Sequence, residues 1–144
     1  QNPGFAVCEK LLAVNRPGKA AGAGFYEYPQ GGTKFLWPEL TNMFPQTTPL
    51  AQQEMIDRML IVQALDTVRC VEEGVLRSVA DANIGSIFGW GFSPFNGGTL
   101  QFINGYGLNK LIARAKELEA KYGERFSVPK LLQDKADKGE LFVD

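Results

Sequence analysis

The residue types that most often carry enzyme chemistry are scarce in this sequence of 144 residues. Histidine is absent, so the chain supplies no imidazole base, no Ser-His or Cys-His pair and no histidine metal ligand. Cys8 and Cys70 each lie among apolar residues with helical spacing, and we expect both thiols to be reduced and buried. Glu72 and Glu73 are adjacent and would leave a helix in different directions, which is unsuited to an acid–base pair. We therefore assign no catalytic, cofactor-binding or metal-binding residue.

Two glycine-rich stretches invite a nucleotide-binding interpretation and do not meet its requirements. A Walker loop ending in the Gly-Lys pair at Lys19 would need glycine at position 13 and Ser or Thr at position 20, where the chain has Ala13 and Ala20. The stretch Gly22-Ala-Gly24 lacks the third glycine of a dinucleotide loop, because Glu27 stands there, and no strand precedes it. We expect Lys19 to lie on the surface or in a turn.

Residues 82–109 hold no charged side chain, yet they contain six of the 16 aromatic residues. Seven glycines, Pro94 and four asparagines in this stretch argue against a membrane span, because a broken helix leaves backbone groups unsatisfied in lipid. Such a segment either packs into the core or docks against a partner, and both interpretations stay open. We expect residues 89–98 to be ordered and to face a neighbouring domain. The candidate interface residues are Trp90, Phe92, Phe95, Asn96, Gly97 and Gly98.

Composition excludes several other classes of protein. Fifteen Lys and Arg against 16 Asp and Glu give a net charge of −1, whereas a nucleic-acid binder usually has a basic surplus. Hydrophobic residues make up 44% of the chain, which is typical of one globular domain and not of a disordered chain. The sequence begins with Gln1 and carries no signal peptide, so we expect a fragment or a processed piece.

Apolar residues recur at helical spacing through most of the chain, and no segment alternates with a period of two. The predicted fold class is all-α: a compact helical domain of five to six helices preceded by a loop-rich N-terminal segment. We expect a long helix over residues 49–73, N-capped by Thr48 and with Ile56 and Met59 among its inward residues. The other predicted helices cover 5–14, 78–88, 99–106, 109–122 and a last segment from Pro129.

Local signals refine two of these helices. Ser78-Val-Ala-Asp81 reads as a capping box, and Ile84, Ile87 and Phe88 are predicted to face inward from the helix that follows. In the 109–122 helix, Glu117 and Lys121 have the spacing of an ion pair, and Gly123 is the expected C-cap.

The motif Gly18-Lys-Ala-Ala-Gly-Ala-Gly-Phe-Tyr-Glu-Tyr28 resembles the signature that closes the C-terminal domain of 3-hydroxyacyl-CoA dehydrogenases, although Ala20 replaces the usual Ser or Thr. Leu36-Trp37-Pro38 is similar to the link found in multifunctional β-oxidation alpha subunits. Residues 54–132 resemble the second copy of the helical domain that follows this link. The stretches that carry this part of the resemblance are Glu72–Val75, Ser78–Asn83, Gly91–Gly98 and Phe126–Leu132.

The resemblance implies three parts: residues 1–28 as the tail of one dehydrogenase C-terminal repeat, 29–48 as an extended linker packed on the domain, and 49–144 as a second helical repeat. It also implies a non-catalytic fragment of an NAD-dependent β-oxidation enzyme, inactive alone, which supports the acyl-CoA cleft and domain assembly. The family's catalytic His and Glu and its NAD-binding glycines belong to a domain that this chain does not contain.

The resemblance further implies the NAD-binding domain of a parent chain as partner, 3-hydroxyacyl-CoA as the parent's substrate, and a thiolase subunit or a second copy as further partners. The implied location is cytoplasmic, or mitochondrial or peroxisomal in a eukaryote. The alternative is a stand-alone helical protein-interaction module without enzymatic role.

Overall fold

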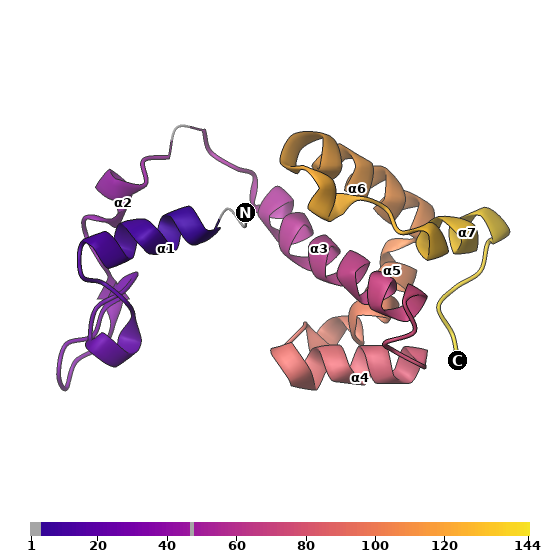
Figure 1. Cartoon of the computed structure of the whole chain (residues 1–144), viewed down its shortest axis with the longest axis horizontal. Coiled ribbons are helices and arrows are strands. Elements are labelled where there is room, and N and C mark those ends of the chain that lie inside the picture. The colour runs from indigo at the N-terminus through magenta and orange to yellow at the C-terminus, as the bar shows by residue number, and fades with distance from the viewer. Residues whose placement is uncertain (1–3, 47) are drawn as a thin grey trace. The chain divides into compact units, whose positions relative to one another are not determined.

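The computed structural model in Figure 1 describes residues 4–46 and 48–144, and it is mainly α-helical there. The predicted fold class is confirmed. The chain divides after Pro49 into two compact units, residues 1–49 and 50–144, which are considered separately.

The first unit combines short helices with a small hairpin. Its elements are α1 (Gly4–Ala13), the 3-10 helix η1 (Lys19–Ala21), β1 (Tyr26–Glu27), β2 (Phe35–Leu36) and α2 (Leu40–Met43). The strands pair antiparallel, with Tyr26 opposite Leu36 and Glu27 opposite Phe35. The hairpin and α2 were not expected from the sequence, because two-residue strands and a four-residue helix are too short to show a hydrophobic period.

Arg16 ties the loops of this unit together. Its Nε donates to the Gly24 carbonyl at 2.8 Å, and its Nη1 lies 2.8 Å from the Glu27 carboxylate. The guanidinium also sits 4.2 Å from the ring centre of Trp37, a cation–π contact. Gly24 must be glycine, because a Cβ there would lie 2.9 Å from the Cα of Gly18. Within the 18–28 motif, Gly24 thus serves close backbone packing, whereas Gly18 and Gly22 adopt positive φ values of 137° and 76°.

The segment predicted as a linker, residues 29–48, contains β2 and α2 and belongs to the first unit by its contacts. The boundary between the compact units therefore falls in the chain between Pro49 and Leu50. That residues 29–48 pack on the second repeat, and that the two units are successive repeats, both stay predictions.

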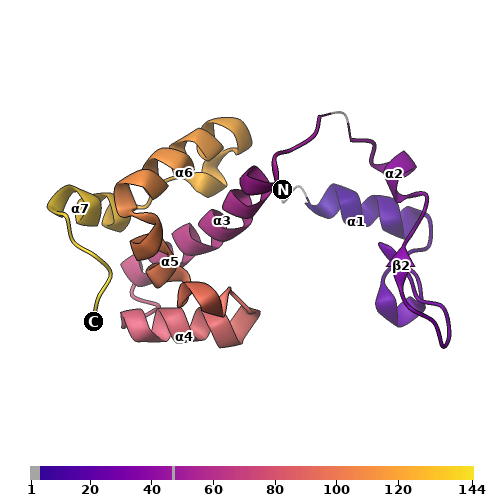
Figure 2. The ribbon, with the colours of Figure 1, turned by 180° about the vertical axis from the view of Figure 1, so that it is seen from behind.

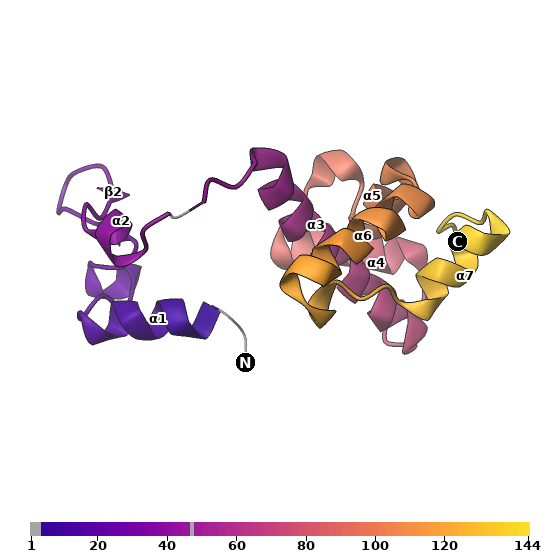
Figure 3. The ribbon, with the colours of Figure 1, turned by 90° about the horizontal axis from the view of Figure 1, so that it is seen from above.

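The second unit is a bundle of α-helices. Its elements are α3 (Gln52–Glu72), α4 (Val79–Trp90), the 3-10 helix η2 (Pro94–Asn96), α5 (Thr99–Tyr106), α6 (Leu108–Tyr122), the 3-10 helix η3 (Glu124–Phe126) and α7 (Lys130–Lys138). Within it, α4 and α6 lie on opposite sides of α3 (Figures 1 and 2). Seen from above, α6 crosses in front of α3, with α4 behind (Figure 3).

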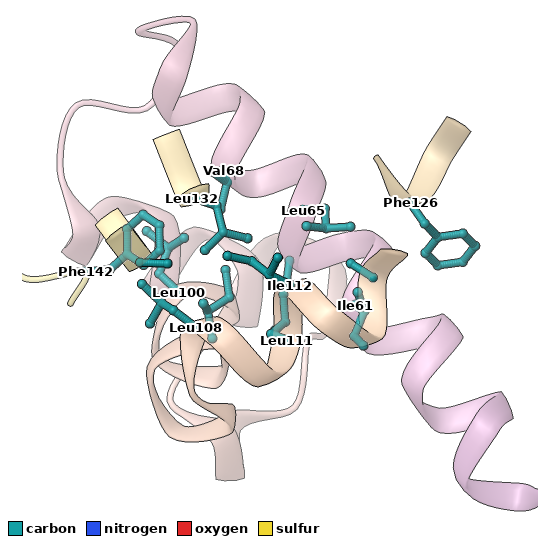
Figure 4. Close-up of a cluster of buried hydrophobic side chains, with 14 of the residues drawn as sticks. Ile61, Leu65, Val68, Leu100, Leu108, Leu111, Ile112, Phe126, Leu132 and Phe142 are labelled. Carbon is teal, nitrogen blue, oxygen red and sulfur yellow. The ribbon is translucent and has the colours of Figure 1, made fainter. Parts of the chain in front are cut away.

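Side chains from five α-helices, α3 to α7, meet in one core, together with side chains from η3 and the C-terminal segment. Figure 4 shows part of this cluster. On α3, Ile61, Leu65 and Val68 lie at the i, i+4, i+7 spacing of one helical face and are fully buried. On α6 the buried residues are Leu108, Leu111, Ile112, Ala115 and Leu118, which form one face of the helix. Gly123 C-caps this helix with a φ of 90°.

Two predictions for α3 are wrong. The helix begins at Gln52 with Ala51 as N-cap, so Thr48 does not cap it. Ile56 and Met59 are 39% and 65% exposed. At about 100° per residue, both lie more than a third of a turn around the helix from the buried Ile61. Because α3 is apolar on several sides, only its tertiary contacts select the inward face.

The cysteine prediction is correct in one respect and wrong in another. Both thiols are free, but Cys8 is exposed on α1 and Cys70 is half-buried on α3. Only Leu11 is buried among the described residues of α1, so that helix has too few covering neighbours to hide its apolar side. Among the described residues, no helix is both long and apolar enough to cross a membrane.

Candidate interface on helix α4 and the aromatic segment

Two residues that are far apart from each other in the sequence, Ser78 and Asp144, cap the N-terminus of α4. The Ser78 side-chain oxygen accepts from the Asp81 backbone N–H at 3.0 Å, which confirms the predicted N-cap. The Asp144 carboxylate accepts from the backbone N–H groups of Val79 and Ala80, at 2.5 and 3.0 Å. These bonds satisfy donors that a helix leaves free in its first turn, and they place a negative charge at the positive end of the helix dipole.

The predicted orientation of α4 is wrong. Its buried residues are Ala82, Asn83 and Ser86. Of the three residues predicted to face inward, Ile84 is 58% exposed and Phe88 is 84% exposed, whereas Ile87 is half-buried. A small, polar face has therefore been buried and a large, apolar face left outside.

Hydrogen bonds to α5 explain why the polar face turns inward. The Asn83 side-chain oxygen accepts from the backbone N–H groups of Leu100 and Gln101, at 2.9 and 3.2 Å. The Ser86 hydroxyl donates to the Asn83 carbonyl at 2.8 Å and accepts from the Thr99 N–H at 3.2 Å. Together these two side chains satisfy the first donors of α5, since no side chain caps that helix locally. These hydrogen bonds thus offset the free-energy cost of burying the polar side chains of Asn83 and Ser86.

Gly98 allows this contact. Its φ of 99° is a conformation that side chains other than glycine rarely adopt, and a Cβ would lie 2.5 Å from the Cα of Asn83. The predicted interface residue Gly98 therefore has an internal packing role.

The aromatic residues of the 89–98 segment behave in three different ways. Phe92 is buried and meets the ring of Phe102 edge-on at 5.9 Å, as expected of a packed segment. Trp90 is the last residue of α4 and 56% exposed, and its indole N–H donates to the Gln63 side chain at 2.9 Å. Phe95 projects from η2 with 98% of its surface exposed. That the segment is an interface stays a prediction, now centred on Trp90 and Phe95.

Helices α3 and α4 border a groove of about 530 Å³. Its walls are mostly apolar or small, with acidic groups at Asp66 and Asp81 and a thiol at Cys70. The lining residues are Gln63, Asp66, Thr67, Cys70, Val75, Leu76, Asp81, Ala82, Gly85, Ser86, Gly89 and Trp90. A smaller hollow of about 390 Å³ includes Phe95 and Asn96 of the predicted interface. An open, largely apolar groove of this size suits docking of a polypeptide or an apolar group.

A polar cluster on the opposite side of the unit joins α3 to α6. Asp57 is only 5% exposed and receives hydrogen bonds from Arg114 Nε and from the Gln53 amide, each at 2.8 Å. Arg114 also pairs with Glu117 at 2.7 Å. The predicted ion pair between Glu117 and Lys121 is therefore wrong. Glu117 pairs with Arg114, and the Lys121 ammonium lies 3.5 Å from the Glu54 carboxylate.

The same cluster shifts several pKa values. The Tyr122 hydroxyl donates to the Glu54 carboxylate; this bond lowers the pKa of Glu54 and raises the pKa of Tyr122. Burial, followed by the nearby charge of Asp57, raises the pKa of Tyr106. Nothing in the sequence distinguishes Asp57 from the solvent-exposed acidic residues of α3. Its role is visible only in the structure, where it pairs with Arg114, 57 positions further along the chain. The cluster binds helix to helix, and no three metal-ligating side chains converge among the described residues.

Comparison with curated proteins relates the chain to one class of enzyme subunit. The fatty acid oxidation complex alpha subunit of Shewanella loihica is 35% identical over 142 residues, which cover 96% of this chain and 20% of that protein. The alpha subunit of Vibrio cholerae is 36% identical over 138 residues, covering 94% and 20%, and that of Vibrio campbellii is 34% identical over 141 residues, covering 96% and 20%. Over this stretch, the chain is similar to fatty acid oxidation complex alpha subunits.

The relationship predicted from the glycine-aromatic motif and from residues 54–132 is thereby confirmed. The chain spans about a fifth of the length of the curated relatives it matches. No protein-family model matches the chain.

Proposed function

We propose that this chain is a helical part of a β-oxidation enzyme of the 3-hydroxyacyl-CoA dehydrogenase type, and that it serves assembly of that enzyme and not its chemistry. The parent would oxidise a 3-hydroxyacyl-CoA to the 3-ketoacyl-CoA, with hydride transfer to NAD. The base and the NAD site would come from the parent's other domains, because this sequence has no histidine and no dinucleotide loop. A cytoplasmic location, or an organellar one in a eukaryote, accompanies this proposal.

One observation carries the assembly role. Phe88 and Phe95 are 84% and 98% exposed, in a unit whose own core is complete without them. Phe88 precedes Gly89, which lines the groove of about 530 Å³, and Phe95 lines the hollow of about 390 Å³. Exposed apolar surface of this kind usually marks an interaction site. The partners proposed for it are the remaining domains of the parent, a thiolase subunit or a second copy.

The test uses trans-complementation. The alpha subunit of Vibrio cholerae, deleted for the stretch that matches this chain, is mixed with the chain, and 3-hydroxyacyl-CoA-dependent NADH formation is followed at 340 nm (the NADH absorption band). We expect the chain alone to bind no NAD in calorimetry and to give no turnover, and the mixture to regain activity. Turnover by the chain alone would overturn the non-catalytic role, and failure of the mixture to co-purify would contradict the assembly role.

The second candidate function, a stand-alone interaction module, is supported by the same exposed surface. It differs in one outcome, since such a module would bind its partner without changing NADH formation in the complemented enzyme.

A further inference from the structure

The groove between α3 and α4 has one wall made of small residues. They follow one side of α4 at helical spacing, and all of them line the groove: Ala82, Gly85, Ser86 and Gly89. A Cβ on Gly85 or Gly89 would meet nothing within 4 Å, and neither glycine has a positive φ. The fold of the unit therefore does not require glycine at these two positions. Their missing side chains leave room for another helix to approach α4 closely.

The dimensions and walls of the groove favour a single helix as its occupant. The stretch from Ala82 to Gly89 rises about 10 Å along α4, which is two helical turns. Both walls are α-helices, so an extended segment would find no strand edge with which to pair. The volume of about 530 Å³ is that of a ligand pocket, and it accommodates a few large side chains. These features fit an amphipathic helix that inserts apolar residues one turn apart.

The charged residues that line the groove are all acidic. Asp66 lies on the α3 wall and Asp81 on the α4 wall, and no Lys or Arg is among the described residues that line it. Within the described part of the chain, the Asp81 carboxylate has no hydrogen bond or ion pair; only its backbone N–H bonds, to Ser78. The Asp66 side chain is 75% exposed and lies 3.5 Å from Arg69.

The neighbouring cations do not neutralise this rim. Arg69 donates to the carbonyl and the hydroxyl of Ser127, at 2.7 and 3.1 Å, so its guanidinium is shared and its exposed pair with Asp66 is weak. Arg77, in the turn between α3 and α4, does not line the groove. Glu73 is exposed and lies two turns after Asp66 on the same side of α3, which extends the negative rim. A partner would therefore meet negative charge on both sides of an apolar floor.

We propose that the α3–α4 groove binds a basic amphipathic helix of a partner protein, with apolar side chains in the groove and Lys or Arg on both flanks facing Asp66 and Asp81. This inference rests on the assembly role proposed above, for which it supplies the chemistry of the partner. Complementary charge across an interface chiefly gives specificity and a faster association rate. The acidic rim thus selects a basic helix over an acidic one that has the same apolar face.

Fluorescence anisotropy of two labelled synthetic peptides, titrated with the full chain, tests this charge preference. Each peptide has about 15 residues, the length at which an isolated helix begins to form. Both have the same leucine face; one carries lysine on both flanks and the other carries glutamate. We expect the lysine peptide to bind at least about tenfold more tightly, because attraction becomes repulsion on each flank, and to bind more weakly as salt rises. Equal affinities, or no binding of the lysine peptide, overturn the proposal.

Substitutions test whether the peptide lies in the groove. Asp66→Asn and Asp81→Asn should each weaken the lysine peptide by about threefold, whereas Glu124→Gln, at an exposed acid outside the groove, should not. Gly85→Leu should weaken it at least about tenfold by filling the groove. Gly105→Leu is the matched control, because Gly105 is also exposed, helical and free of neighbours within 4 Å but lies on α5. Unchanged melting temperatures show that the variants are folded, and equal effects of test and control variants overturn the proposal.

Thiol alkylation with iodoacetamide locates the peptide independently. Cys70 lines the groove and Cys8 is exposed in the other unit, so the lysine peptide should slow labelling of Cys70 and leave labelling of Cys8 unchanged. Binding that leaves Cys70 unprotected would place the peptide elsewhere and overturn the proposal.

The complementation assay described above separates this inference from the assembly role. Regained activity without binding of the lysine peptide would remove the basic helix and leave the assembly role standing. Binding of the lysine peptide in the groove without complementation would contradict the assembly role and leave the charge preference of the groove established.

Discussion

At the residue scale, the second unit depends on positions where a single side chain, or the absence of one at a glycine, lets two helices contact each other. Gly98 leaves room for Asn83, and Asn83 in turn supplies hydrogen-bond acceptors to α5. Arg114 pairs with Asp57 across the α3–α6 interface. Each of these contacts joins residues well separated in the sequence. Removing any one of them should lower the free energy of unfolding by a measurable amount.

Gly98→Ala should destabilise the second unit by at least about 2 kcal/mol, since it adds a clash with Asn83 to a positive-φ strain. Gly105→Ala, at an open helical position, should instead stabilise it by up to about 1 kcal/mol. Urea unfolding followed by circular dichroism measures both. Equal effects of the two variants would show that the close approach of Gly98 is unimportant.

Arg114→Met should lower the free energy of unfolding by about 3 kcal/mol, because it leaves the buried Asp57 carboxylate without its cation. Lys116→Met on the exposed side of the same helix is the control and should change little. Adding Asp57→Asn to Arg114→Met should restore part of the loss, since the uncompensated charge is then gone. Strict additivity of the two substitutions would contradict the pairing.

Glu54 gives stability a pH dependence. The Tyr122 bond lowers its pKa below the ordinary 4.5. A carboxyl with a lower pKa in the folded state contributes stability above its unfolded pKa, and this contribution is lost as pH falls through the folded pKa. Acid should therefore destabilise the wild-type protein below about pH 4.5 more steeply than Tyr122→Phe, which lacks the bond. Thermal melts between pH 3 and 7 give the comparison (range chosen to bracket the ordinary pKa), and identical slopes would exclude this role of the bond.

At the scale of elements, the C-terminal segment holds α4 and α5 from outside. Phe142 is 1% exposed, and the Asn104 side chain bonds both its backbone N–H and its carbonyl, at 3.0 and 2.9 Å. Two residues later, Asp144 caps α4. The end of the described chain therefore fixes the helix that carries the exposed apolar face.

Asp144→Ala should lower unfolding stability by about 1 kcal/mol, the usual effect of losing a helix cap, and should speed hydrogen exchange in the first turn of α4. Val143→Ala is the adjacent control, since Val143 is 69% exposed. Exchange rates at Val79 and Ala80 that do not change in Asp144→Ala would show that the carboxylate does not act as a cap.

At the scale of the whole molecule, the core cluster lies entirely within the second unit, from Ile61 to Phe142. The first unit depends on a different set of contacts, centred on Arg16. We therefore expect each unit to have its own unfolding transition.

Residues 50–144 expressed alone should fold, with a melting temperature within a few degrees of the corresponding transition in the full chain. Arg16→Ala in the full chain should leave that transition unchanged, because Arg16 makes its contacts within the first unit. Differential scanning calorimetry distinguishes the transitions. Loss of folding in the 50–144 fragment would show that the first unit supplies part of its stability.

The sequence by itself determined the all-α class, the positions of α3 to α7 to within a few residues, the Ser78 and Gly123 caps and the relationship to β-oxidation alpha subunits. These follow from local signals: helical periodicity, capping chemistry and linear motifs. Tertiary structure alone decided which side of α4 is buried. Hydrophobicity would have turned Ile84 and Phe88 inward, but the hydrogen bonds of Asn83 and Ser86 to α5 and the close approach of Gly98 require the small, polar side there. Contacts between residues far apart in sequence leave no periodic trace, so the exposed apolar face of α4 could be found only in the folded molecule.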